Sequence, residues 1–172
     1  ADESDRSLLH LQATIAVVTN ISREHLDTYR DIDDIKNTFK QFLYNLPFYG
    51  TAILCSDNAH IRSLLPLTHI RTIKYGIDHP EFADIWARDI DLQPDYSTFS
   101  VYNKEQCLGS VLLAMPGKHN ILNALATIAV AQELDIPFDD IKQGLASFKG
   151  VDRRFTFKRT YKGADFFDDY GH

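Results

Sequence analysis

The feature that most constrains the fold is an alternation of short apolar, β-branched runs with helical segments. The run Thr14–Asn20 (TIAVVTN) is typical of a strand buried on both faces, and Thr51–Ser56 (TAILCS) has the same character. Between them, apolar residues recur at helical spacing over Asp31–Leu46, and acidic residues occupy the first turn. A short helix over Ala59–Leu65 and a strand over Arg71–Tyr75 continue the pattern. This β-α-β-α-β order predicts an α/β fold with a mainly parallel sheet flanked by helices.

The middle of the chain breaks the alternation. Strand-like stretches follow one another without helices between them at Ile85–Ile90, Thr98–Tyr102 and Cys107–Ala114. A turn over Asn103–Gln106 would join the last two, although it lacks the Asn-Gly pair typical of tight hairpins. We therefore expect a small antiparallel extension of the parallel sheet. Helices are predicted over Asn120–Leu134, which is rich in Ala and Leu, and over Phe138–Phe148.

The pattern changes again near the end of the chain. Gly150 marks a break, and two strand-like runs follow at Phe155–Arg159 and Ala164–Phe167. We place a domain boundary near Lys149, with residues 1–149 in a central domain and 150–172 at the start of the next. The chain begins at Ala1 without a methionine and ends directly after a strand, so we expect it to be a segment of a longer protein.

Composition narrows the class of protein. The net charge of −6 argues against a general nucleic-acid or anionic-membrane binder, which usually has a basic surface. No apolar run approaches the roughly 18 residues expected of a membrane span, and nothing resembles a signal peptide. The two cysteines, Cys55 and Cys107, have no metal-type spacing, which favours free thiols in a reducing compartment.

The first candidate site residues follow the first strand. His25 and Asp27 fall just past it, and in a parallel sheet ligands bind beyond the carboxyl ends of the strands. A histidine with nearby carboxylates can bind a divalent metal or move a proton. A solvated loop before a helix explains the same residues without any ligand, and a short motif alone favours that interpretation.

The second candidate is Pro116–Asn123 (PGKHNILN), at the start of the Ala-rich helix. Asn120 and Asn123 are three residues apart, so their side chains share a helix face. A side-chain amide both donates and accepts hydrogen bonds, which suits the edge of adenine. The alternative is that Asn120 caps the helix and Asn123 lies on an ordinary surface.

Two further segments carry polar residues, and several common motifs are missing. Arg153-Arg154 could reach a phosphate across a cleft, or it could be a surface basic pair. Asp168–His172 (DDYGH) ends a strand and could place polar groups at a site, or form a plain turn. The phosphate-loop pattern Gly-x-x-x-x-Gly-Lys-[Ser/Thr] is absent from the chain, as are Gly-x-Ser-x-Gly, His-Glu-x-x-His and Cys-x-x-Cys.

Taken in order, these segments resemble a known family. They are Ala1–Asp5, Thr19–Ile21 with His25–Tyr29, Leu46–Gly50, Pro116–Asn120 with Asn123, Arg153–Phe155 and Asp168–His172. The series resembles the Mur ligases over nearly the whole chain, most weakly over residues 70–113. The sequences NLPFYG and DDYGH point to the member of the family that adds L-alanine.

The resemblance implies an ATP- and Mg²⁺-dependent ligase of peptidoglycan precursor synthesis in the bacterial cytoplasm. Such a ligase phosphorylates the carboxylate of UDP-N-acetylmuramate with ATP, and the amino group of L-alanine then attacks the acyl phosphate. The tetrahedral intermediate expels phosphate, while magnesium and cationic groups offset the charge. The implied fold is that of the family's middle, ATP-binding domain.

The resemblance also assigns roles to residues. It implies His25 as a magnesium ligand, and Asn120 and Asn123, together with His119, as nucleotide-binding residues. It places Asp169 on the ribose and Arg154 opposite the phosphates, with Tyr170 and His172 nearer the reacting groups.

The departures from the family pattern set further expectations. The family's phosphate loop and the glutamate that partners the metal-binding histidine should lie upstream of Ala1, and the UDP-binding domain and most of the closing domain are missing. We therefore expect the isolated chain to be inactive. Two alternatives stay open: a murein-peptide recycling ligase, and a non-catalytic nucleotide-binding or interaction module. A phosphate-loop lysine upstream in the parent gene would argue against the second.

Overall fold

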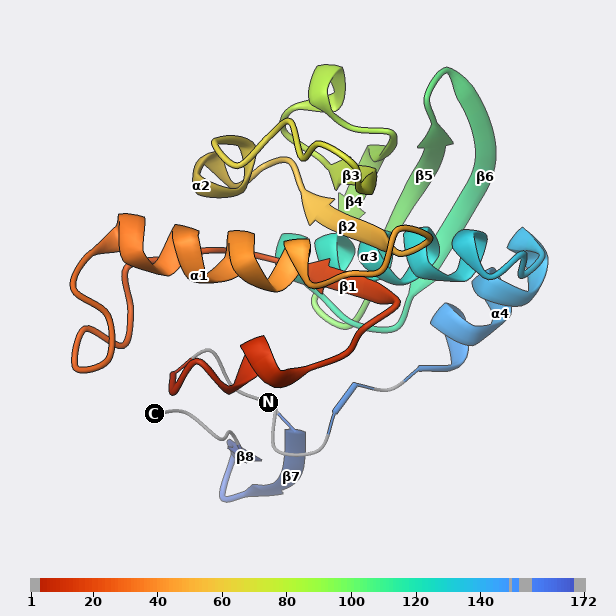
Figure 1. The fold of residues 1–172 in the computed structure, drawn as a ribbon. Helices are drawn as coiled ribbons and strands as arrows, with labels where there is room; N and C mark the ends of the chain where they lie inside the picture. Colours follow the sequence, from red (N-terminus) through yellow and green to blue (C-terminus); the bar gives the residue numbers. More distant parts are fainter. Residues whose placement is uncertain (1–3, 149, 152–155, 169–172) are drawn as a thin grey trace.

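The computed structural model describes residues 4–148, 150–151 and 156–168. Its main sheet has six strands in the order β1-β2-β3-β4-β5-β6, which is also their order in the chain (Figure 1). The strands are β1 (Ile15–Val18), β2 (Thr51–Cys55), β3 (Arg71–Gly76), β4 (Ile85–Leu92), β5 (Ser97–Asn103) and β6 (Gln106–Leu113). The helices are α1 (Ile32–Tyr44), α2 (Ala59–Arg62), α3 (Lys118–Glu133) and α4 (Phe138–Ser147), with 3-10 turns η1 (Ser7–His10) and η2 (Pro80–Phe82).

The pairing of the strands confirms the predicted parallel sheet with an antiparallel extension. Pairs β1–β2, β2–β3 and β3–β4 are parallel, whereas β4–β5 and β5–β6 are antiparallel. The turn between β5 and β6 is Lys104-Glu105, inside the predicted hairpin, and Lys104 takes a positive φ of 51°. The positions and types of strands β1–β6 and helices α1–α4 agree with the sequence prediction to within a few residues, whereas the two 3-10 turns were not predicted.

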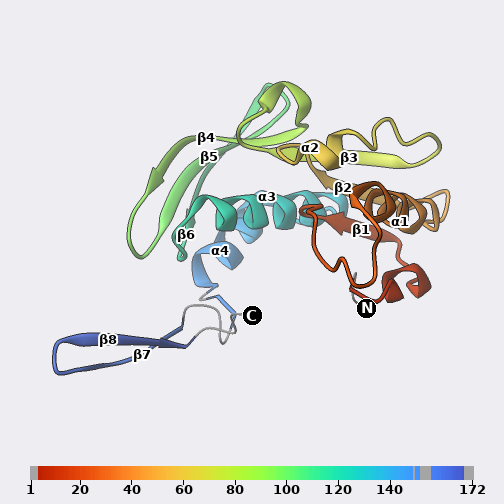
Figure 2. The ribbon, with the colours of Figure 1, turned by 90° about the vertical axis from the view of Figure 1, so that its left-hand side faces the viewer.

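Helices cover both faces of the parallel part of the sheet. In Figures 1 and 2, α1 lies on one face and α3 on the other. Asp31 directly precedes helix α1 and is its N-cap, because its carboxylate accepts the N–H of Asp34; Asp33 and Asp34 occupy the first turn. Helix α3 packs against β2, β3 and β4, and α4 packs against β6 and α3. The described helices include none that is long and apolar enough to span a bilayer.

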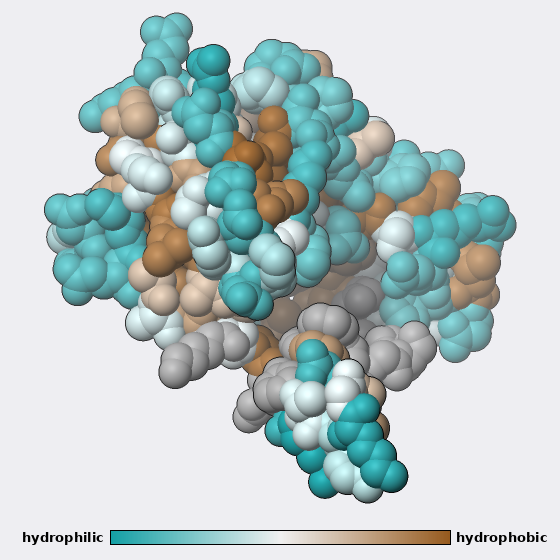
Figure 3. All heavy atoms as spheres, turned by 180° about the vertical axis from the view of Figure 1, so that it is seen from behind, coloured by the Kyte–Doolittle hydropathy of each residue, from teal (hydrophilic) through white to brown (hydrophobic). Residues whose placement is uncertain are grey.

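The core lies between these layers, and burial corrects one prediction. Every residue of β2 is buried, as expected for a strand covered on both faces. Strand β1 is not buried on both faces, because Val17 keeps 39% of its surface exposed. It is the terminal strand of the described sheet, so a side chain on its outer face has fewer neighbours to cover it. Seen from the side opposite to Figure 1, hydrophobic side chains gather near the middle of the surface with hydrophilic ones around them (Figure 3).

The last described strands form a separate sheet. Strands β7 (Thr156–Tyr161) and β8 (Ala164–Asp168) pair antiparallel and stand apart from the main sheet in Figures 1 and 2. The pairing agrees with the two strands expected after Gly150. The domain boundary near Lys149 stays a prediction.

Candidate functional site

The loops that follow the parallel strands gather at one edge of the sheet. Strands β1, β2 and β3 run parallel and end at Val18, Cys55 and Gly76, and the arrowheads of β1 and β2 point to the side where α3 begins (Figure 1). Open α/β sheets bind ligands at this carboxyl edge. The edge therefore holds the candidate site, and it contains the described residues that the sequence singled out.

His25 lies in the loop between β1 and α1 and has a left-handed backbone with φ of 54°. Its carbonyl accepts the N–H groups of Thr28 and Tyr29 at 2.9 and 3.0 Å, so the loop makes a tight turn directly after the histidine. Tyr29 is buried, whereas Asp27 is exposed. The half-buried histidine thus has a defined place in a folded loop, although its conformation is uncommon for residues other than glycine.

The far end of this loop is tied down by a buried carboxylate. Asp34 Oδ2 accepts the backbone N–H of Arg30 at 3.1 Å and forms an ion pair of 2.7 Å with Arg6. The Arg6 guanidinium also lies 4.7 Å from the centre of the Tyr29 ring. The Arg30 N–H, together with Arg6, lowers the pKa of Asp34, so this carboxylate is ionised at neutral pH. The end of the His25 loop that leads into α1 is therefore held in place.

The surroundings of His25 fit one part of a metal site. A small cavity of about 40 Å³ is lined by His25, Asn20, Ser22, Glu24, Tyr29 and apolar neighbours. Mg²⁺ takes oxygen ligands and usually keeps waters and substrate phosphates, so it needs few protein groups. The described residues contain no group of three or more His, Cys, Asp or Glu side chains that could hold a metal. His25 offers a ring nitrogen rather than the oxygen that Mg²⁺ prefers, so its role as a magnesium ligand rests on the family resemblance, and the described residues form no all-protein cage for the ion.

The start of α3 is built around Gly117 rather than Asn120. Gly117 has a φ of 98° and precedes the first helical residue, and the ring of His119 packs so closely that a Cβ on Gly117 would approach it to 2.8 Å. Asn120 lies inside the first turn, and its Nδ2 donates to the carbonyl of Pro116 at 2.7 Å. The alternative in which Asn120 caps the helix is therefore wrong. Instead, the Asn120 side chain forms a hydrogen bond with the loop that precedes the helix.

Asn123 presents its amide one turn further along α3. It is exposed, as are Lys118 and His119, and it lies on the same helix face as Asn120. The N-terminus of a helix carries unpaired N–H groups and a partial positive charge, which favour a phosphate or another anion. Polar side chains beside a helix N-terminus can thus contact a base while the helix end favours the charged groups of a nucleotide.

The structure brings His25 and the start of α3 to one edge without joining them in one cavity. His25 follows β1, whereas Lys118 pairs with Asp78 in the loop after β3. Strands β1 and β3 are two strand spacings apart, or about 10 Å. The small cavity beside His25 has neither Asn120 nor Asn123 in its lining. That the three side chains open onto one cleft stays a prediction. Arg154, Asp169, Tyr170 and His172 lie outside the described residues.

Two residues that the sequence analysis did not single out organise this edge. Asp57 accepts three backbone N–H groups, from Ile77, Asp78 and His79, at 2.8–3.2 Å. Asn58 donates from Nδ2 to the carbonyl of Ile21 at 3.1 Å. The available signal was an Asp-Asn pair directly after a buried strand, at the edge where parallel sheets bind ligands. These four partners are 20 or more residues away in the chain, which spacing alone does not indicate.

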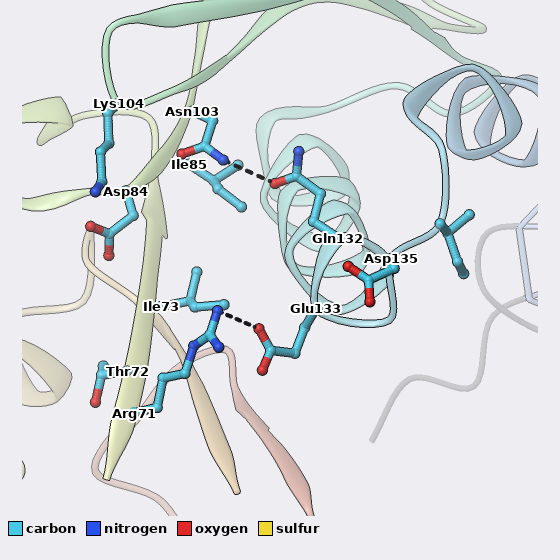
Figure 4. Close-up of a pocket in the computed structure, with 11 residues that line it drawn as sticks. Arg71, Thr72, Ile73, Asp84, Ile85, Asn103, Lys104, Gln132, Glu133 and Asp135 are labelled. Carbon is cyan, nitrogen blue, oxygen red and sulfur yellow. Dashed lines mark hydrogen bonds and ion pairs between the residues drawn. The ribbon is translucent and has the colours of Figure 1, made fainter. Parts of the chain in front are cut away.

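A larger cavity lies at the opposite edge of the sheet. Its volume is about 600 Å³, and it lies between the start of β3 and the end of α3 (Figure 4). Arg71 pairs with Glu133 at 2.9 Å, and Asn103 donates to Gln132 at 3.4 Å across it. These polar groups bond to one another rather than converging on the carboxyl edge. The cavity is therefore separate from the candidate site.

Comparison with known families decides the assignment. The family model described as the Mur ligase middle domain matches residues 2–131. The chain belongs to the Mur ligase family. The family resemblance that the sequence indicated is therefore confirmed.

Curated Mur ligases match the whole chain. It is 50% identical over 172 residues to UDP-N-acetylmuramate–L-alanine ligase of Geotalea uraniireducens, and 48% identical to the enzyme of the same name from Syntrophus aciditrophicus. The chain spans 37% and 35% of the length of these proteins. It is therefore similar to about a third of each ligase.

Solved Mur ligase structures share the fold. UDP-N-acetylmuramate-alanine ligase from Thermotoga maritima matches 99% of the chain and 38% of its own length, with a TM-score of 0.82 and 21% identity. The MurF structure from Acinetobacter baumannii has a TM-score of 0.79 and 26% identity, over 96% of this chain and 36% of its own. A MurF ligase from Thermotoga maritima, with a TM-score of 0.71, 22% identity and coverage of 91% of this chain and 35% of its own, was solved in complex with ADP.

Proposed function

We propose that this chain forms the nucleotide-binding part of an ATP-dependent ligase that joins L-alanine to UDP-N-acetylmuramate. The observation that carries the proposal is the 48–50% identity, over all 172 residues, to curated ligases of that name. The fold supports it, because the candidate metal and nucleotide residues lie at the carboxyl edge of the parallel strands. The setting would be peptidoglycan precursor synthesis in the bacterial cytoplasm.

The chemistry requires a carboxylate to be activated before an amine can displace oxygen from it. ATP supplies the phosphoryl group, the resulting acyl phosphate is attacked by the amino group of L-alanine, and phosphate leaves. Bound Mg²⁺ would neutralise negative charge on the phosphates. His25 would hold that ion in part, and the exposed amide of Asn123 would contact adenine beside Asn120 and His119.

The roles of the remaining candidates rest on the family resemblance. Arg154 would face the phosphates, Asp169 would bind the ribose, and Tyr170 and His172 would lie nearer the reacting groups. A guanidinium suits the first role because its fork of donors matches phosphate oxygens. We propose that residues 150–172 begin the domain that brings these groups to the nucleotide.

One sister activity has a structural counterpart. Murein peptide ligases from Psychrobacter arcticus and Neisseria meningitidis share the fold at 22% and 24% identity, with TM-scores of 0.72 and 0.75. At that identity only the fold is supported, whereas the L-alanine ligases of Geotalea uraniireducens and Syntrophus aciditrophicus are about twice as similar in sequence. We therefore favour L-alanine as the amine over an L-alanyl-γ-D-glutamyl-meso-diaminopimelate peptide.

The test is phosphate release by the full-length ligase with ATP, Mg²⁺ and UDP-N-acetylmuramate. L-alanine should stimulate release and give a product of the expected mass, and the peptide should not. Stimulation by the peptide alone would support the recycling ligase, and no stimulation by either would support a non-catalytic module. Asn123→Ala should raise the KM for ATP about 5- to 150-fold, since a base contact of this kind is worth about 1–3 kcal/mol.

A matched control distinguishes loss of the proposed adenine contact from the general effect of replacing an exposed helical asparagine by alanine. Asn37 is exposed on α1, on the other face of the sheet, so Asn37→Ala removes the same side chain from a helix surface. It should leave the KM for ATP within about twofold, since surface substitutions rarely matter. Equal effects of the two substitutions would contradict the adenine role of Asn123.

A further inference from the structure

We propose that Asp57 and Asn58 are positioning residues that set the location of the His25 loop relative to the start of α3. The proposal rests on the proposed function, because it assumes that these two segments bind the metal and the base of one nucleotide. Ser56, Asp57 and Asn58 form the turn that follows β2, and we call it the Ser56–Asn58 turn. Strand β2 lies between β1 and β3, so this turn is next to the loops that follow both of them.

The turn itself is anchored in the core. Ser56 is buried, and its N–H and Oγ both donate to the carbonyl of Tyr75, at 2.7 and 2.9 Å. The Arg62 guanidinium donates to the carbonyl of Ser56. Gly76 packs directly on the turn, since a Cβ there would lie 2.5 Å from Ser56 Oγ and 2.6 Å from Asp57 Oδ1. The turn is therefore a rigid support on which neighbouring loops can be placed.

Asp57 places the start of α3 through the loop after β3. Its Oδ2 accepts the N–H of Ile77, and its Oδ1 accepts the N–H groups of Asp78 and His79, which fixes the backbone of this loop. The carboxylate of the same Asp78 pairs with the ammonium of Lys118, the first residue of α3. A chain of contacts thus runs from Asp57 to the helix turn that carries Asn120.

Asn58 places the loop after β1. Its Nδ2 donates to the carbonyl of Ile21, which is buried with 2% of its surface exposed and precedes His25 by four residues. Its Oδ1 accepts the N–H of Ile61 and so caps α2. The Asn58 side chain therefore links the His25 loop to the Ser56–Asn58 turn, which also contacts the loop whose Asp78 pairs with Lys118 at the start of α3. A nucleotide whose base and phosphates bind at two separate segments requires their spacing to be held within about 0.5 Å.

Two isosteric substitutions separate the contact of Asp57 with the loop after β3 from the contact of Asn58 with the loop after β1. Asp57→Asn replaces one carboxylate oxygen by an NH₂ that faces an N–H donor, so at least one of the loop contacts is lost. Asn58→Asp keeps the oxygen that caps α2 but replaces the donor to Ile21 by a carboxylate oxygen, which repels the Ile21 carbonyl. In the full-length ligase, Asp57→Asn should raise the KM for ATP about three- to tenfold, as expected for one lost hydrogen bond. Its kcat at saturating ATP and its KM for UDP-N-acetylmuramate should stay within about twofold.

Asn58→Asp should act on the metal side instead. We expect the Mg²⁺ concentration for half-maximal activity to rise about three- to tenfold, as for one lost hydrogen bond. Mn²⁺ binding in the presence of ADP, followed by the electron paramagnetic resonance signal of the free ion, should weaken by a similar factor. This second measurement does not depend on turnover.

Two control variants repeat the same chemistry away from the candidate site. Asn45→Asp removes an equivalent bond, in which Asn45 Nδ2 donates to the carbonyl of Leu9 at 3.1 Å near the end of α1. Asp84→Asn perturbs a carboxylate that accepts the N–H of Lys74 at 2.8 Å. Neither should change the KM for ATP or the Mg²⁺ requirement by more than about twofold, as expected for sites remote from the chemistry.

Hydrogen exchange on the 172-residue chain provides the structural measurement. Asp57→Asn should accelerate exchange at the amides of residues 77–79. If it does so while the KM for ATP stays within twofold of the wild-type value, the positioning role is overturned and the ligase assignment is unaffected. If the wild-type ligase shows no ATP-dependent ligation, the proposed function fails first. Should Asp57→Asn fail to fold, Asp78→Asn removes the exposed contact to Lys118, and an unchanged KM for ATP would overturn the proposal.

Discussion

Replacement of Gly76 by alanine should destabilise the domain, although the change adds a single methyl group. Gly76 ends β3 where it passes the Ser56–Asn58 turn. A Cβ at this position would lie 2.5 Å from Ser56 Oγ and 2.6 Å from Asp57 Oδ1. These distances are roughly 0.8–0.9 Å short of the 3.4 Å at which ordinary contact begins, so both neighbours would have to move.

Neither neighbour can move without cost. Ser56 Oγ donates to the buried carbonyl of Tyr75, and Asp57 Oδ1 accepts the N–H groups of Asp78 and His79. Overpacking of a filled site typically costs about 1–3 kcal/mol, and a lost hydrogen bond to a charged group about 1.5–3 kcal/mol. Because relaxation of the chain relieves part of both costs, we expect less than their sum, a reduction of about 2–4 kcal/mol in the free energy of unfolding.

Differential scanning calorimetry of the 172-residue chain measures the effect. For a domain of this size the expected loss corresponds to a Tm lower by about 4–16 °C. Gly144→Ala is the matched control, because Gly144 lies within α4 and an added Cβ would meet nothing within 4 Å. Alanine there should stabilise the helix by about 0.5–1 kcal/mol. A Tm for Gly76→Ala equal to or above the wild-type value would refute the reasoning.

Three further predictions concern the isolated chain. It should bind ATP weakly, because the chain lacks the phosphate-loop motif. A base contact contributes about 1–3 kcal/mol, which falls short of the roughly 8 kcal/mol of binding free energy in a micromolar complex. A micromolar Kd measured by calorimetry with Mg²⁺ would contradict this prediction. The Arg30 N–H and Arg6 hold the pKa of Asp34 below its ordinary value of 3.8. The stabilisation of the fold by the Asp34 carboxylate is therefore complete above pH 3.8 and is lost as the pH falls through the lowered pKa. The stability difference between wild type and Asp34→Asn in urea titrations should therefore shrink on acidification, and a difference that grows would refute the sign. Cys107 is exposed and Cys55 is buried, and burial raises the pKa of the Cys55 thiol, so a thiol reagent should modify one cysteine in the native chain and both only after unfolding.

The elements of the fold could be predicted because each follows from local pattern. The helical spacing and acidic first turn identified α1, and the break in alternation after β3 identified the antiparallel extension. The exposure of Val17 could not be predicted, since an apolar run does not reveal which strand will be terminal in the sheet. Strand order is decided by tertiary packing, which the local sequence does not contain.

The candidate site was predictable to the extent that it depends on strand ends. His25 follows a strand and Asn123 belongs to a helix start, so general rules for parallel sheets placed both at the carboxyl edge. Asp57 and Asn58 were missed because their partners, Ile77 to His79 and Ile21, are distant in the chain. A hydrogen bond between loops has no periodicity, and only the folded backbone reveals it.

The order of the strands has a consequence for how the domain is made. Each strand of the main sheet pairs with the one synthesised just before it, so the sheet can assemble progressively as the polypeptide leaves the ribosome. Helix α3, which packs on β2, β3 and β4, follows all six strands in the chain. Until it emerges, the apolar face of those strands stays uncovered. The nascent sheet should therefore be a target for chaperones that bind exposed hydrophobic surface, up to the moment at which α3 is released.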